Sequence, residues 1–160
     1  MAKKKTARTT ETAPLKWQDA QNLLKMLKAD NQHETRLMFA VGFYTGLRIS
    51  DILRLKWETV WGPPKEFSVQ EQKTGKTRKI QVHTDLADII REAKAALSPD
   101  KVGYIFTSKK GPSIGQPLTV VGANLRIKDA LAAYGINTQN ASSHCLRKTF
   151  ARRVYEANQQ

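Results

Sequence analysis

Three segments far apart in the chain carry side chains suited to phosphate chemistry: TGLRISDILRL (residues 45–55), QKTGK (72–76) and SHCLRKTF (143–150). The first segment contributes Arg48 and the second contributes Lys73. The third contributes His144 and Arg147, which lie three residues apart and therefore share one face of a helix. Because the planar fork of arginine binds two phosphate oxygens at once, this set predicts a site for one phosphate diester.

Arg48 and Lys73 also have purely structural interpretations. Asp51 follows Arg48 by three residues, so we expect its carboxylate to pair with the guanidinium and orient it. The alternative is an exposed Arg48–Asp51 ion pair that contributes little stability. Lys73 could instead be a solvent-facing residue of a turn, and Lys76 and Lys79 compete with it for a role at the site.

The intervening sequence predicts the elements that position these side chains. Residues 34–45 are almost continuously apolar, which indicates a buried helix that ends at Gly46. Alternating apolar residues on both sides of KTGKT (73–77) predict a two-strand hairpin with a basic tip. Helical spacing of apolar residues predicts helices near 17–28, 86–97, 120–134 and from 142–143 onward, the last burying Leu146, Phe150 and Val154. The expected fold class is α+β, mainly helical with a small antiparallel sheet.

With these motifs in this order, the chain resembles the catalytic domain of the tyrosine recombinases, the phage integrase family. The resemblance covers residues 15–160 as one domain, after a flexible basic tail at residues 1–14. It implies that Asp51 supports the first arginine. It also implies an enzyme that breaks and rejoins DNA through a 3′-phosphotyrosyl intermediate. The catalytic residues that it implies are Arg48, Lys73, His144 and Arg147.

The resemblance further implies a Gly-His motif and a nucleophilic tyrosine well downstream of Arg147. Neither is present before the last residue, Gln160, so we expect an incomplete domain that is inactive alone. Tyr155 lies eight residues after Arg147 on the same predicted helix, too far along it to attack a phosphate that the arginine holds. We therefore expect Tyr155 to have a packing role.

The charge balance predicts a polyanionic partner. The chain of 160 residues has 27 Lys and Arg against 14 Asp and Glu, which gives a net charge of +13. Such an excess favours double-stranded DNA through counterion release, although charge alone would fit any protein that coats nucleic acid. Lys76, Lys148 and Arg152 are candidates for contacts with the DNA backbone. The resemblance implies self-association on DNA in the complete protein.

Neither a metal nor a cofactor is expected. The sequence has no obvious metal-ligand cluster and no phosphate-binding glycine loop. Its single cysteine, Cys145, is next to His144, but adjacent residues of a helix point in different directions, which disfavours a Cys–His nucleophile. The sequence shows no stretch of membrane-spanning length and no signal peptide, so we expect a cytoplasmic protein without a membrane partner.

Two other functions remain open on the sequence. A non-catalytic DNA-binding regulator could keep the same scaffold without a nucleophile. A type IB topoisomerase would use the same set of catalytic side chains, and the spacing of these motifs does not distinguish it from a recombinase.

Overall fold

The computed structural model describes residues 12–60, 65–97, 102–138 and 140–159. It confirms the expected fold class, because helices dominate and the described strands form one antiparallel pair. In chain order the elements are α1 (Trp17–Ala29), α2 (His33–Thr45), α3 (Ile49–Ile52), β1 (Glu66–Gln70), β2 (Thr77–Gln81), α4 (Thr84–Leu97), the 3₁₀ helix η1 (Gly111–Ser113), α5 (Val120–Ala133) and α6 (His144–Ala157).

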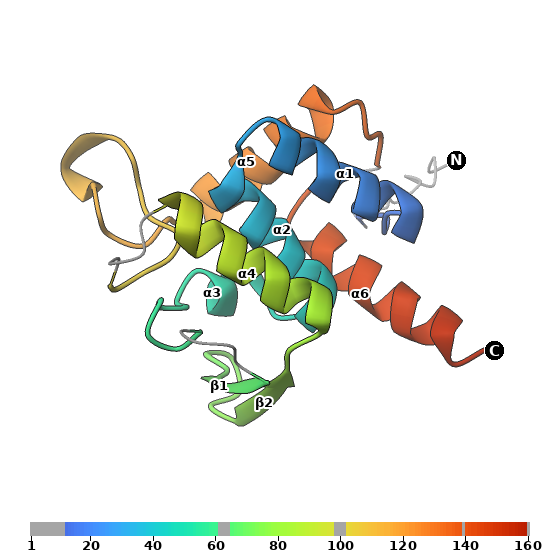
Figure 1. Cartoon of the computed structure of the whole chain (residues 1–160), viewed down its shortest axis with the longest axis horizontal. Coiled ribbons are helices and arrows are strands. Elements are labelled where there is room, and N and C mark those ends of the chain that lie inside the picture. The colour runs from blue at the N-terminus through green and yellow to red at the C-terminus, as the bar shows by residue number, and fades with distance from the viewer. Residues whose placement is uncertain (1–11, 61–64, 98–101, 139, 160) are drawn as a thin grey trace, which may run out of the picture.

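Helix α2 forms the centre of the fold. Every residue from Leu37 to Thr45 is buried, as expected for a helix that is apolar on all sides. The helix packs against α1, α4 and α6, and Figure 1 shows it in the middle of these helices. It ends at Gly46, whose φ of 67° is left-handed and whose amide donates to the carbonyl of Gly42. Glycine adopts this conformation without steric cost, so α2 stops where the sequence predicts.

The hairpin follows the predicted alternation of apolar residues. Phe67 lies opposite Ile80 in the antiparallel register, and both side chains are buried. At the tip, the Glu71 amide donates to the carbonyl of Lys76, and Gly75 adopts a positive φ of 70°. This tight turn carries the residues of KTGKT out of the core and toward solvent.

An ion-pair cluster joins the three helices on one side of the core. Glu92 of α4 binds Arg36 of α2 and Lys28 of α1, the latter at 3.2 Å. The Arg36 side chain is almost buried, so it needs this partner. The cluster therefore fixes α1 and α4 against α2.

The last helix is less buried than the sequence predicts. Leu146 is buried and Phe150 is half-buried, but Val154 is 42% exposed. The packing role expected for Tyr155 is also wrong, because that side chain is 65% exposed. Figure 1 shows the reason: the later turns of α6 extend past the helices against which its first turns pack.

Residues 1–11, most of the expected basic tail, lie outside the described residues. Thr12 is buried, and its hydroxyl bonds to the carbonyl of Asn140 and the hydroxyl of Ser142. The Leu15 amide donates to Thr149 Oγ1, so the approach to α1 is attached to α6 and the segment before it. Among the helices that the structure describes, none is long and apolar enough to cross a membrane.

Candidate phosphate-binding site

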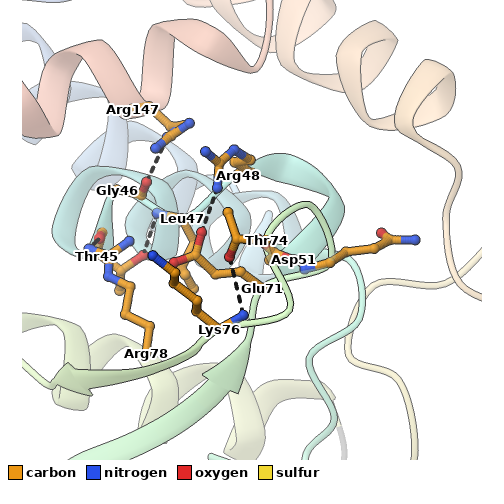
Figure 2. Close-up of polar contacts among 11 residues, drawn as sticks. Thr45, Gly46, Leu47, Arg48, Asp51, Glu71, Thr74, Lys76, Arg78 and Arg147 are labelled. Carbon is orange, nitrogen blue, oxygen red and sulfur yellow. Dashed lines mark hydrogen bonds and ion pairs between the residues drawn. The ribbon is translucent and has the colours of Figure 1, made fainter.

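The bend between α2 and α3 positions the first arginine. Gly46 turns the chain at the end of α2, and Arg48 then precedes α3 with extended backbone angles, φ −65° and ψ 146°. Its Nη1 donates to Glu71 Oε2 at 2.5 Å, across to the hairpin (Figure 2). The Arg48 side chain is 29% exposed, so part of the guanidinium remains accessible.

The second arginine and the histidine come from the first turns of α6. His144 is the first residue of this helix and is exposed. Arg147 lies almost one turn later, and its Nε donates to the carbonyl of Gly46 at 2.8 Å. The start of the helix is fixed by the Ser143 amide, which donates to Asn124 Oδ1 of α5 at 2.8 Å. The same glycine that ends α2 therefore also orients Arg147.

The four residues that the sequence singled out line one cavity, although they come from three separate parts of the chain. Its volume is about 360 Å³, and we call it the basic cavity. The exposed Lys73 reaches it from the hairpin tip. Its complete lining is Arg48, Ile49, Ser50, Lys73, Val120, Asn124, Ser143, His144 and Arg147. The named lining residues include no carboxylate, so the cavity is suited to an anion.

Electrostatics show that positive charge is concentrated here. The pKa of Arg147 is lowered, first by burial and then by the nearby charges of Arg48 and Arg78. Glu71 and Asp51 act in the opposite direction. Arg78 is held close by a bond from its Nη2 to the carbonyl of Thr45 at 2.7 Å. Because Arg48 and Arg147 repel each other and both line the basic cavity, an anion bound there would be favoured by both charges.

The expected pairing of Asp51 with Arg48 is not what the structure shows. Asp51 is only 2% exposed, and its Oδ1 accepts the backbone amide of Gln72 at 3.0 Å. The acidic partner of Arg48 is Glu71, which the sequence interpretation missed. The buried Asp51 carboxylate therefore joins α3 to the hairpin backbone. The sequence did offer one indication of this partner, because Glu71 lies two residues before Lys73 in the predicted hairpin.

The three candidates for DNA-backbone contacts lie outside the lining of the basic cavity. Lys76 is exposed at the hairpin tip, and Lys148 is half-buried beside Arg147 on α6. Arg152 pairs with Glu156 one turn later at 2.8 Å. Their roles in DNA contact stay predictions.

The remaining nucleophile candidates are not among the residues that line the cavity. Cys145 is fully buried, and burial raises the pKa of its thiol, so the structure gives no support for a thiolate nucleophile. Tyr44 is buried, and its pKa is raised to about 12 by burial and by Asp85. None of the four tyrosines, all within the described residues, lines the basic cavity. In the described ranges, no three His, Cys, Asp or Glu side chains lie together as a metal site.

Comparison with known proteins identifies the family. The sequence model of the phage integrase family matches residues 7–159, so the chain belongs to this family, the tyrosine recombinases. No curated protein sequence gives a significant match.

Solved structures of recombinases share the fold. The XerH site-specific recombinase, in a post-cleavage complex with a palindromic difH substrate, matches with a TM-score of 0.71 and 18% identity over 100% of this chain and 46% of that one. The Tn1549 transposon integrase, in complex with a circular intermediate DNA, gives a TM-score of 0.74 and 17% identity over 95% of this chain and 56% of that one. XerA recombinase matches with a TM-score of 0.73 and 21% identity over 98% of this chain and 53% of that one. The chain thus spans about half the length of these structures.

Proposed function

We propose that this chain binds duplex DNA and holds one phosphate diester in the basic cavity, as part of an enzyme that breaks and rejoins DNA strands. The observation that supports the proposal most is the convergence of Arg48, Lys73, His144 and Arg147 on a single cavity. The family adds support, because the related XerH and Tn1549 structures contain DNA.

The proposed chemistry assigns each side chain a task. A tyrosine hydroxyl attacks the phosphorus, and the bond to the 5′ oxygen breaks while a 3′-phosphotyrosyl bond forms. Arg48 and Arg147 stabilise the added negative charge of the transition state. Lys73 gives a proton to the departing 5′ oxygen, and His144 assists proton transfer. Because the phosphodiester energy is conserved in the covalent bond, this reaction needs neither a metal nor a nucleotide.

The electrostatic part of the proposal rests on the net charge of +13. Each Lys or Arg that neutralises a DNA phosphate releases counterions, so the affinity for duplex DNA should fall steeply as salt rises. A titration with a short duplex between about 50 and about 200 mM salt measures this dependence. Weak binding that is insensitive to salt would contradict a DNA-binding function. Self-association on DNA and a cytoplasmic location stay predictions for the complete protein.

We further propose that the attacking tyrosine is none of the four in this sequence. Tyr155 is on the same helix as Arg147, and eight residues of helix separate them by about 12 Å along the axis. Tyr44 is buried, and its raised pKa of about 12 keeps its hydroxyl protonated. A nicked suicide duplex, followed by denaturing electrophoresis, should therefore give no covalent adduct with this chain. An adduct that disappears in the Tyr155→Phe variant would make Tyr155 the nucleophile.

A second candidate is a DNA-binding regulator without catalysis, which would use the same basic cavity to hold a phosphate. Such a protein would occupy recombination sites and block them. The two functions differ in one result: a product of the same gene that contains a suitable tyrosine would form the covalent adduct only if the family's chemistry is retained.

A further inference from the structure

The Arg48–Glu71 ion pair belongs to a two-point connection between α3 and the hairpin. At one point, Arg48, just before α3, binds the Glu71 carboxylate of the hairpin. At the other, Asp51 within α3 accepts the amide of Gln72, the next hairpin residue. The two bonds therefore join α3 and the residue before it to two consecutive residues of the hairpin. Lys73 follows immediately in the chain.

The position of Glu71 relative to the two neighbouring cavities indicates what its carboxylate does. Arg48 lines the basic cavity, and Glu71 is not part of that lining. Glu71 instead lines a second cavity of about 340 Å³, between α3 and the hairpin, together with Asp51. The carboxylate therefore binds the guanidinium from outside the lining of the basic cavity.

The hydrogen-bonding capacity of the guanidinium fits this arrangement. The Glu71 carboxylate accepts a hydrogen bond from Nη1 of Arg48, and a guanidinium group has five N–H donors in all. The other donors can bind a phosphate while this contact persists. A carboxylate that binds the arginine from outside the basic cavity orients the guanidinium, whereas a carboxylate inside the cavity would compete with DNA.

We propose that Glu71 is a positioning residue for the phosphate site: it fixes the Arg48 guanidinium toward the basic cavity and holds the Lys73 hairpin against α3. This inference rests on the proposed function. In this proposal Glu71, rather than Asp51, orients Arg48. Asp51 binds the backbone amide of Gln72 in the hairpin instead.

The test uses a variant for which the proposal and simple electrostatics predict opposite changes in DNA affinity. Glu71→Ala removes a negative charge beside a DNA site, which by charge alone would tighten binding. We expect it instead to weaken binding of a short duplex about three- to tenfold, because Arg48 loses its orientation. Glu71→Gln keeps an acceptor for Nη1 and should restore most of the affinity. The matched control is Glu66→Ala on the same hairpin, where the exposed carboxylate accepts a hydrogen bond from Gln81 Nε2 at 2.8 Å. This variant should leave the affinity unchanged or raise it.

A double-mutant cycle separates this role from a general effect on the fold. In an Arg48→Ala background, Glu71→Ala should cause no further loss of affinity, since its effect passes through Arg48. Glu71→Ala that tightens binding, leaves it unchanged, or weakens it equally without Arg48 would overturn the inference. If Arg48→Ala itself leaves duplex affinity and its salt dependence unchanged, the proposed function fails instead.

A second measurement uses the unaltered chain, so its result does not depend on whether the variants fold. In the unaltered chain, the Arg48 Nε–H signal in nuclear magnetic resonance spectra should be sharp before any anion is added, and inorganic sulfate should shift it together with that of Arg147. A signal that is broad without sulfate would contradict an arginine held in position by Glu71, whereas a sharp signal that sulfate does not shift would contradict the proposed phosphate site.

Discussion

Replacement of Gly46 by alanine tests how one residue joins the fold to the site. A Cβ at this position would lie 2.7 Å from Cε1 of Phe150, and closer still to Cδ1. The left-handed φ of 67° costs a non-glycine residue about 1–2 kcal/mol. Forcing the Phe150 ring away adds about 1–3 kcal/mol. We therefore expect Gly46→Ala to lower the free energy of unfolding by about 2–5 kcal/mol.

The matched control is Gly135→Ala, at the end of α5. Gly135 has nearly the same φ, 68°, but no atom lies within 4 Å of an added Cβ. Only the backbone cost of about 1–2 kcal/mol should appear there. Urea unfolding of both variants gives the steric part as a difference, and Phe150→Ala in the Gly46→Ala background should remove that part. Equal destabilisation at Gly46 and Gly135, or additive effects of Gly46→Ala and Phe150→Ala, would refute the reasoning.

Three further predictions concern other parts of the molecule. A hydrogen bond from Arg36 holds the pKa of Glu92 below its ordinary 4.5, so the ionised carboxylate stabilises the fold above pH 4.5, and this stabilisation is lost as the pH falls through the lowered pKa. Glu92→Gln should therefore lower the unfolding midpoint at pH 7 but have the same midpoint as the unaltered chain in strong acid. Equal midpoints at pH 7 would contradict this. Cys145 should react with a thiol reagent at the rate of global unfolding, because its thiol is buried and its pKa is raised; rapid labelling of the folded chain would be the opposite result. Arg147→Lys should weaken duplex binding about tenfold, because lysine has no fork to bind both phosphate and the Gly46 carbonyl, whereas Arg152→Lys should change it little.

The sequence could predict the elements because their signals are local. The continuous apolar run of α2 and the stop at Gly46 both appear as expected. The basic residues of the site could also be predicted from the sequence, because Arg48 and Arg147 lie in recognisable motifs near the ends of helices. These features depend on neighbours within a few residues, which the sequence displays directly.

The sequence could not predict the partners across elements. Arg48 pairs with Glu71, 23 residues away, rather than with Asp51, three residues away, because α3 buries the Asp51 carboxylate. The Gly46 carbonyl accepts from Arg147 across 101 residues. Nor could helical spacing show that Tyr155 would be exposed, since burial depends on where the other helices end.

The central claim is that Arg48 and Arg147, with His144 and Lys73, hold one phosphate. The most direct measurement is a crystal structure of this chain bound to a short DNA duplex. We predict one phosphate in the basic cavity, within hydrogen-bonding distance of both guanidinium groups, while the Glu71 carboxylate still contacts Arg48. A duplex whose phosphates contact the two arginines separately, or that binds another face of the protein, would contradict the account.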